Sequence, residues 1–410
     1  MISGDVRVAN LVKTPGIRKE KHLRTRFIGF LGCLMGLLLV LPVMGQDASS
    51  APAEPAAMPA APQGSAPPTW SVGPINFSGA VDGYYSYNAN HPASRINGLY
   101  NFNINANQFG LGIAEIALDH APDPVGFRVD LGFGDAYRIV NSLDNDGGFN
   151  RYLQQAYVSW RPTGGKGFQA DFGKFVTSAG AEVIESYSNW NYSRSLLFAW
   201  AIPYYHFGLR TSVPMGSHFT AGVQVVNGWN SVVDNNNAKT VVVTGTTTFS
   251  KFAWAVGWHG GPENANTSSG WHHLIDTTLT LTPTSKVSAY INYDYHQQRH
   301  QNNFFFPNGT LTEWQGIAAA LKLQANDKWA FTSRGEWFQD RQGHSTGVAQ
   351  QLKEVTFTGE YKMAEGLLTR AEYRHDWSNQ PFFERGNFPG SFKSQDTFTV
   401  AFVAFFGPNR

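Results

Sequence analysis

From residue 74 onward, apolar and polar side chains alternate along the chain in segments of about ten residues, the length that a tilted membrane strand requires. In 125–134 Val, Phe, Val, Leu and Phe alternate with Gly, Arg, Asp, Gly and Gly, and 287–296 and 329–338 repeat the pattern. Successive side chains of a β-strand point to opposite faces, so this period of two is typical of strands with one apolar and one polar face. No window beyond residue 70 predicts a useful amphipathic helix. The sequence therefore predicts an all-β fold.

The connections between these segments alternate in length. Those after even-numbered strands are short, such as 121–124, whereas those after odd-numbered strands are mostly long, such as 178–203 and 378–394. Short turns at one end and long loops at the other are typical of antiparallel up-and-down membrane barrels. About sixteen strands are expected, within a range of 14 to 18. Their predicted limits are 75–87, 107–119, 125–137, 151–161, 168–177, 204–213, 217–229, 239–249, 251–259, 271–282, 286–297, 313–324, 328–339, 351–362, 366–377 and 395–406.

The composition agrees with a membrane barrel. Charged residues make up 15% of the chain and aromatic residues 14%, which suits a protein with an apolar outside and a polar inside. Lipid offers no partner to a free backbone N–H or C=O, so an open sheet edge would cost several kcal/mol per group. The strand 395–406 must therefore pair with 75–87. A barrel of this size also encloses more space than side chains can fill, which predicts an aqueous channel.

Aromatic residues gather near both ends of the predicted strands, on the apolar face. Two such girdles are expected at the two headgroup layers of a bilayer. The alternative is that aromatic residues merely favour strands. The candidate girdle residues are Trp160, Trp229, Trp258, Tyr295, Trp329, Trp337, Tyr361, Trp377 and Phe406.

The N-terminal region has the pattern of an export signal. Basic residues precede an apolar run over 27–41, which is shorter than the roughly 20 residues of a membrane span. We predict a signal peptide over 1–45 and an Ala/Pro-rich periplasmic linker over 46–73, followed by an outer-membrane barrel over 74–410. A membrane anchor is the alternative. The single cysteine, Cys33, lies inside the apolar run, and a lipoprotein signal there is a weaker alternative.

Five segments of the predicted barrel resemble a known family. They are 126–134, 155–159, 173–182, 191–195 and 203–210, of which Gly-Lys-Phe at 173–175 with Gly-Ala-Glu at 180–182 is the most specific. The stretch from residue 74 resembles the OmpL-like β-barrel porin family. This resemblance implies an outer-membrane location and a porin activity, and it names no substrate.

The connection 178–203 is the longest, with about 26 residues, and it is unusually apolar. Such a loop should pack against something, and the barrel interior is available. By resemblance to general porins, in which the loop at this position folds inward, we assign it as a constriction between the fifth and sixth strands. The alternatives are a cap over the barrel mouth and an oligomer interface. The candidate constriction residues are Glu182, Glu185 and Arg194.

The inward wall is predicted from strand parity, because charges are tolerated facing water and not facing lipid. It is expected either to orient charged solutes or to stiffen the barrel through ion pairs, and the two roles are compatible. Lys174 falls on the outward face by strict alternation. The predicted pore-lining residues are Arg128, Asp130, His206, Arg210, Arg334, Glu336, Glu354, Glu360, Arg370, Glu372 and Arg374.

Several function classes are disfavoured. The net charge of +1 gives no case for a nucleic-acid partner. No catalytic motif is found, His272 and His273 would face opposite sides of a strand, and no catalytic residue, metal or cofactor is predicted. We expect a porin for small hydrophilic solutes and ions, surrounded by outer-membrane lipid and assembled as a homotrimer. A non-conducting barrel with a structural or surface-attachment role is the alternative, and a hydrolase is a distant third.

Overall fold

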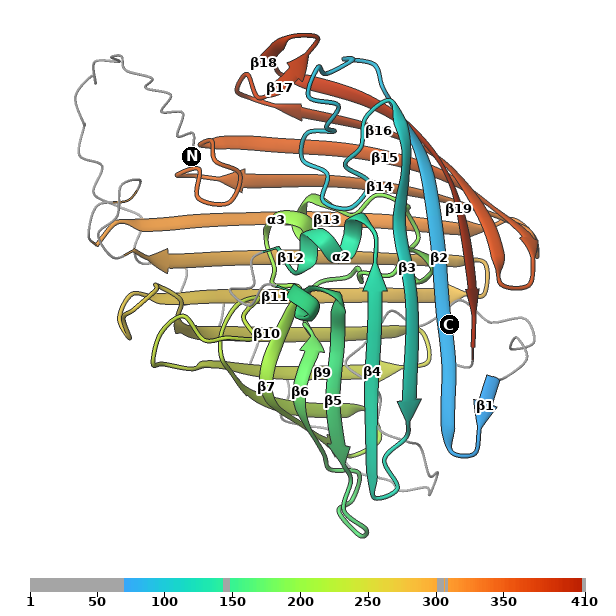
Figure 1. The fold of residues 1–410 in the computed structure, drawn as a ribbon, viewed down its shortest axis with the longest axis vertical. Coiled ribbons are helices and arrows are strands. Elements are labelled where there is room, and N and C mark those ends of the chain that lie inside the picture. Colours follow the sequence, from blue (N-terminus) through green and yellow to red (C-terminus); the bar gives the residue numbers. More distant parts are fainter. Residues whose placement is uncertain (1–69, 143–147, 301–305, 307–308, 408–410) are drawn as a thin grey trace. The chain divides into compact units, whose positions relative to one another are not determined.

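The computed structural model describes residues 70–142, 148–300, 306 and 309–407, so the predicted signal peptide and most of the linker lie outside the described residues. Sixteen antiparallel strands form one closed barrel (Figure 1). They are β2 (Ile75–Asn88), β3 (Gln108–His120), β4 (Val125–Phe133), β5 (Leu153–Trp160), β6 (Gln169–Val176), β7 (Tyr205–Met215), β8 (Phe219–Val226), β9 (Thr240–Phe249), β10 (Phe252–Pro262), β11 (Trp271–Thr284), β12 (Val287–Arg299), β13 (Leu311–Gln324), β14 (Trp329–Asp340), β15 (Gln350–Ala364), β16 (Leu367–Ser378) and β19 (Ser394–Phe406).

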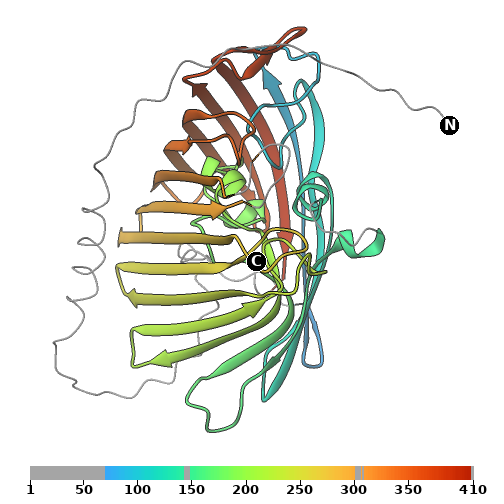
Figure 2. The same cartoon turned by 90° about the vertical axis from the view of Figure 1, so that its left-hand side faces the viewer.

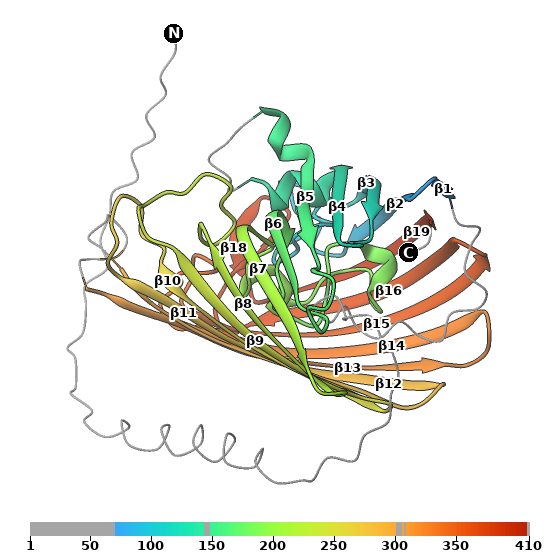
Figure 3. The ribbon, with the colours of Figure 1, turned by 90° about the horizontal axis from the view of Figure 1, so that it is seen from below.

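The barrel closes through its first and last long strands. Residues 397–406 of β19 pair with 79–88 of β2 in continuous antiparallel register, and each remaining strand pairs with its two neighbours (Figures 1 and 3). The predicted closed, antiparallel all-β barrel of sixteen strands is therefore confirmed, and every predicted strand has a counterpart. No helix in the described part of the chain is long and apolar enough to cross a membrane.

Side chains alternate between the two faces of the barrel wall as the period of two requires. On β19, Phe398, Val400 and Phe402 are about half exposed on the outer face, whereas Thr397 and Thr399 are buried inside. The same alternation runs along the long strands β11–β16. The outer face is therefore apolar and the inner face polar, as expected for a wall between lipid and water.

Four short elements depart from the predicted boundaries. Strand β4 ends at Phe133, and the helix α2 (Asp135–Val140) follows where the sequence predicts strand up to residue 137. The reason is Gly134, whose φ of 105° breaks the strand and whose position leaves no room for a side chain, since a Cβ would lie 2.5 Å from the Gly112 carbonyl. The strand β1 (Trp70–Val72) pairs with the start of β2, inside the predicted linker, and β17 (Phe383–Arg385) with β18 (Phe388–Phe392) forms a hairpin in the last long loop.

Candidate functional site: the barrel interior

The connection between β6 and β7, residues 177–204, contacts inward side chains from several strands, and we call it the inner loop. Its backbone N–H groups donate to Asp276 on β11, Glu336 on β14 and Glu372 on β16. The loop contains a short 3₁₀ turn, η2 (Ser186–Ser188), and the helix α3 (Leu196–Trp200), which packs against β13 and β14. In Figures 1 and 2 the green helix α3 lies beside the orange strands β13 and β14.

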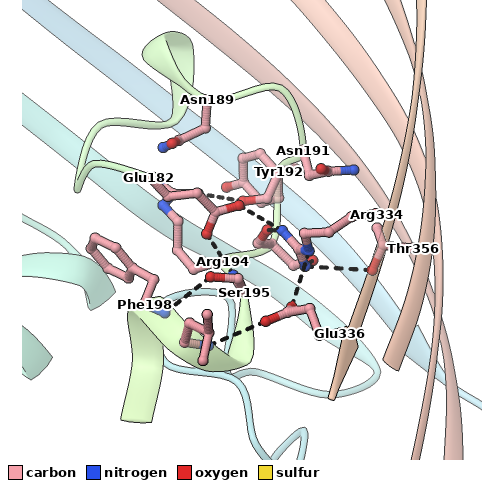
Figure 4. A network of polar contacts seen from close by, with 12 residues as sticks. Glu182, Asn189, Asn191, Tyr192, Arg194, Ser195, Phe198, Arg334, Glu336 and Thr356 are labelled. Atoms are coloured by element: carbon pink, nitrogen blue, oxygen red, sulfur yellow. Dashed lines mark hydrogen bonds and ion pairs between the residues drawn. The ribbon is translucent and has the colours of Figure 1, made fainter. Parts of the chain in front are cut away.

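Arg334 on β14 anchors the middle of the inner loop (Figure 4). Its guanidinium pairs with Glu182 of the loop at 2.7 Å and with Glu354 at 2.8 Å, and it also lies 3.1 Å from Glu336. One of its N–H groups donates to the Ser193 carbonyl oxygen at 2.8 Å. All four charged side chains are buried. A planar guanidinium with five donors suits such a site, because it can contact several carboxylates at once.

The first turn of α3 is held by a carboxylate. Glu336 accepts the backbone N–H groups of Leu196 at 3.0 Å and Leu197 at 3.2 Å, and the N-cap residue Ser195 accepts that of Phe198. The free N–H groups at a helix start need such acceptors when they are buried. The apolar side chains of α3 then pack into the largest buried cluster of the barrel.

Residues 186–194 are held by the wall of β15 and β16. Glu372 accepts the N–H groups of Tyr192 and Ser193 at 2.7 and 2.9 Å, and Arg370 donates to the Ser186 and Asn189 carbonyls at 2.6 Å. Two side chains of this segment donate hydrogen bonds to the wall, Tyr192 to Asp82 on β2 and Asn191 to Thr358 on β15. In the other direction, Arg374 on β16 donates to the Arg194 carbonyl. Residues 186–194 of the inner loop are thus held by side chains of β2, β15 and β16.

A second loop packs on the first, and sequence reasoning missed it. In the loop 89–107, the Leu99 carbonyl accepts from Trp200 Nε1 at 3.0 Å, and Phe102 packs edge-to-face on Phe198. Leu99 and Phe102 are almost fully buried. The two loops together fill the part of the interior next to β13–β16, β19 and β2. The sequence gives little indication of this packing, because the loop 89–107 is rich in asparagine and resembles an ordinary polar connection.

A cavity of about 290 Å³ lies along the other side of the interior, bordered by residues of β3–β11. Serine and threonine residues of β7, β8, β9 and β11 line one part of it, and Arg128 and Arg210 line another. Both arginines are paired, Arg128 with Asp130 at 2.9 Å and Arg210 with Asp171 at 2.7 Å. Ser178, Gly180 and Ala181 of the inner loop bound the cavity, so the start of this loop forms its roof.

Residues 74–406 match the family described as "Putative beta-barrel porin-2, OmpL-like". The chain belongs to this family. Membership gives this OmpL-like porin an outer-membrane location and a channel role in general. No curated protein matches the chain closely enough to count as a relative.

Solved outer-membrane proteins share the fold of this OmpL-like porin. OmpT of Vibrio cholerae has a TM-score of 0.55 and 13% identity, over 82% of this chain and 100% of that one. An anion-selective porin from Comamonas acidovorans has a TM-score of 0.54 and 10% identity, over 81% and 99%. OmpF of Salmonella typhi has a TM-score of 0.55 and 12% identity, over 81% and 97%. At these identities the likeness concerns the fold alone.

The three predicted constriction residues do not line the cavity of this porin. Glu182 pairs with Arg334, and the Arg194 guanidinium donates to the Val183, Ile184 and Tyr192 carbonyls of its own loop. Glu185 is half-buried beside η2. The cavity is bounded instead by the small residues at the start of the loop. The alternation of side chains along strands could not predict which loop residues border the cavity, because a loop has no such alternation.

The predicted pore-lining residues all lie on the inner face, as parity requires. Only Arg128 and Arg210 among them border the cavity. Asp130 pairs with Arg128, and the His206 Nδ1–H donates to the Gly228 carbonyl oxygen at 2.9 Å. The others, on β14–β16, hold one another and the inner loop rather than facing open space: Arg334, Glu336, Glu354, Glu360, Arg370, Glu372 and Arg374.

One predicted girdle residue is misplaced. Trp229 lies beyond the end of β8, and its ring packs 4.3 Å from that of the inward His272, so it is an interior residue. The backbone N–H of Trp229 donates to the carboxylate of Glu263, which follows β10. Burial raises the pKa of the Glu263 carboxyl to about 7. The other girdle candidates lie on the outer face near the strand ends: Trp160, Trp258, Tyr295, Trp329, Trp337, Tyr361, Trp377 and Phe406.

Lys174 is a charged residue at an outward-facing position of β6. It pairs in register with Ala156 and Phe207, yet it is almost fully buried. Its ammonium donates to Asn141 Oδ1 at 2.7 Å and lies 4.1 Å from the Tyr205 ring centre. Because Asn141 caps the C-terminus of α2, the residues after β4 cover this strand end.

The two sides of the interior differ in how their buried polar groups are satisfied. Within the described residues, β13–β16, β19 and β2 contain no buried side-chain N or O without a hydrogen-bond partner. Buried polar groups normally have hydrogen-bond partners, and water supplies those that the protein does not. Buried side-chain atoms without a partner in the protein occur on β7–β12, in His206, Gln224, His259, Thr278, Tyr290, Asp294 and His296.

Proposed function

We propose that this porin is a passive diffusion channel for small hydrophilic solutes and ions. The observation that carries the proposal is the 290 Å³ cavity beside β7–β11, lined by hydroxyl, amide and paired charged side chains within a closed barrel. A laterally sealed space with polar and charged groups in its lining suits solutes that keep part of their hydration shell. On this proposal the start of the inner loop narrows the path. Assembly as a homotrimer belongs to the same proposal, supported by the trimer form of Vibrio cholerae OmpT.

A non-conducting barrel is the second candidate, and one observation favours it. The loops 89–107 and 177–204 pack against each other and fill one side of the interior with buried apolar side chains. A barrel filled throughout would be a structural or surface-attachment protein. The cavity along the other side of the interior is the reason for preferring the channel.

Conductance separates the two candidates. The chain from residue 46 is refolded in detergent and added to a planar lipid bilayer in KCl. We expect stepwise current increases from the folded protein, and none from a heat-denatured sample of the same preparation. Folded protein that inserts into vesicles without stepwise currents would favour the non-conducting barrel.

A further inference from the structure

Histidine and tryptophan rings gather inside the barrel at the end where the connections between strands are long. His272 lies at the start of β11, His296 near the end of β12, and Trp314 near the start of β13, and all three are buried. Two further histidines join them, His300 directly after β12 and His344 in the loop after β14. We call the four histidines the histidine cluster.

The rings of the histidine cluster contact one another and the indole between them. Nε2 of His272 lies 2.6 Å from Nε2 of His296. The rings of His296 and His344 both stack on that of Trp314, and the ring centres of His300 and His344 are 4.6 Å apart. The four imidazoles and the indole therefore form one connected group.

The contact between His272 and His296 requires that at least one of the two rings is neutral. A neutral imidazole has one N–H donor and one acceptor nitrogen, so one ring can donate to the other across 2.6 Å. Two imidazolium rings would instead bring two N–H groups and two positive charges together, and the contact would be lost. Histidine is the side chain that changes its charge between about pH 5 and 8, so acid acts on this contact directly.

The histidine outside the strands shows the sign of the effect. Burial and the neighbouring His300 lower the pKa of His344 from 6.5 to about 4. A base whose pKa is lowered by packing stabilises the packed arrangement fully above pH 6.5 and loses this stability as the pH falls towards 4. The packed histidine cluster is therefore favoured near neutral pH and disfavoured in acid.

Within the described residues, no acid forms a salt bridge with the histidine cluster. The further imidazoles that act on it, His259 on β10 and His273 on β11, would add positive charge in acid. At the same end of the barrel, Arg341 and Glu313 pair with each other at 3.0 Å. Three more acids lie on the neighbouring elements, each accepting hydrogen bonds from backbone or amide N–H groups: Glu263, Asp294 and Asp340. Protonated imidazoles of the cluster would thus repel one another without a paired carboxylate.

The histidine cluster and the cavity occupy different ends of the same part of the wall. The cavity reaches the short turns, because residues 121–122 line it, and it extends along β11 as far as Asp276. His272 lies on the same face of β11, four residues closer to the long loops, and none of the four histidines lines the cavity. A solute that follows this wall through the barrel therefore meets both.

The inner loop is tied to the same cluster. Trp314 Nε1 donates to the Ala201 carbonyl at 3.4 Å, directly after α3. Ser345, next to His344, donates through its Oγ to the Trp200 carbonyl at 2.5 Å. Separation of the rings would release the end of α3 as well as open the wall above the cavity.

We propose that the histidine cluster is a pH-sensitive closure of the channel, packed near neutral pH and opened when its imidazoles take up protons in acid. The inference rests on the proposed channel function. Protonated rings repel one another, so the stack on Trp314 separates and the contacts to the inner loop are lost. The path between the long loops and the cavity then widens.

Conductance at two pH values tests the closure. Single-channel conductance in KCl is measured at about pH 7.5 and about pH 4 for the wild type, for H272Q/H296Q, and for the control H91Q/H218Q, which changes two exposed histidines outside the cluster. Glutamine keeps a polar side chain that takes up no proton. We expect a conductance about twofold or more higher in acid for the wild type and the control, and a ratio near one for H272Q/H296Q.

A second variant protects the test from a folding defect in the strands. H300Q/H344Q removes the two histidines that lie outside the strands and should also lower the conductance ratio. Folding of every variant is checked by its heat-dependent mobility on electrophoresis. The wild-type ratio retained by the folded cluster variants would overturn the proposal, and so would a ratio near one in the wild type.

Tryptophan fluorescence of the same detergent-folded proteins keeps this test separate from the proposed function. Trp229 and Trp314 contact the histidine cluster, and a protonated imidazole quenches a neighbouring indole. We expect acid to lower the fluorescence of the wild type and H91Q/H218Q, and to lower it less in H272Q/H296Q. If no protein conducts at either pH, the channel function fails while the fluorescence still decides whether the cluster takes up protons. Equal fluorescence titrations in all three proteins would show that the cluster stays neutral, against the proposal.

Discussion

At the scale of single residues, the interior uses two different ways to bury polar groups. On β14–β16, acids face arginines and the backbone of the inner loop, so each charge has a partner. On β7–β12, single atoms of hydroxyl, amide and imidazole groups have no hydrogen-bond partner within the protein. Paired buried charges fix a geometry, whereas unpartnered polar groups need water. This difference divides the interior into a side that holds the inner loop and a side that borders the cavity.

Replacing Arg334 with methionine tests the side that holds the inner loop. The R334M variant leaves Glu182, Glu336 and Glu354 without their shared guanidinium, and removing one partner of a buried ion pair costs about 3–5 kcal/mol. We therefore expect the free energy of unfolding, measured by urea titration of tryptophan fluorescence in lipid vesicles, to fall by about 3 kcal/mol or more.

The matched control for R334M is R341Q. Arg341 pairs with Glu313 at 3.0 Å, but its side chain is 49% exposed. An exposed pair contributes about 0–1 kcal/mol, so R341Q should unfold close to the wild type. Equal losses of stability in the two variants would contradict the role assigned to Arg334.

Which residues face inward could be predicted from parity, but most partners could not. Arg334 and Glu354 are adjacent only because β14 and β15 pair in one register, which the long loop between them does not reveal. The register that sets Asp276 on β11 opposite Asp294 on β12 could have been predicted from the sequence. The tight turn after β11 sets Leu281 opposite Ala289, and counting outward from there brings Asp276 opposite Asp294.

At the scale of elements, the strands could be predicted because one face of each meets lipid, so the period of two is strict. Prediction failed where a segment leaves the wall. Gly134 ends β4 early, and the segment up to Trp229 turns inward after β8. The apolar content of 178–203 predicted its need for packing, while the asparagine-rich loop 89–107 carried no such signal. Loop conformation depends on tertiary partners, which local sequence does not encode.

Shortening the inner loop tests its part in narrowing the path. A variant with residues 183–199 replaced by two glycines loses α3 and its apolar side chains, which occupy the interior beside β13 and β14. We expect its single-channel conductance in KCl to rise about twofold or more, because the cross-section open to water grows.

The control for this deletion is the removal of 265–268, a mostly exposed part of the loop between β10 and β11. This change leaves the inner loop intact and should keep the wild-type conductance. A shortened inner loop with unchanged conductance would mean that another segment limits the current.

At the scale of the whole molecule, closure decides whether this chain can exist in lipid at all. Every backbone group of a strand in the bilayer needs a partner, so β19 must return to β2 across more than three hundred residues of chain. The sequence predicted this pairing from the cost of an open edge, without any local signal linking the two strands. The closing pair is therefore the contact on which all other registers depend.

A disulfide between β2 and β19 tests whether these two strands close the barrel. Ser86 and Thr399 are direct partners, and their hydroxyl oxygens lie 3.4 Å apart inside the barrel. Paired strand residues have Cα separations of about 4.5–5.5 Å, within the range that a disulfide spans. Expressed from residue 46, the chain has no native cysteine, so S86C/T399C should form one bond on oxidation.

The bond should stabilise the barrel strongly, because it closes a loop of 313 residues and so restricts the unfolded chain by up to about 5 kcal/mol. We expect S86C/T399C to keep its folded mobility on electrophoresis to a higher temperature than the wild type, and to lose this gain on reduction. The control S86C/T332C places the second cysteine on β14, which does not adjoin β2, and should form no intramolecular bond. Failure of S86C/T399C to crosslink in folded protein would mean that β2 and β19 are not neighbours.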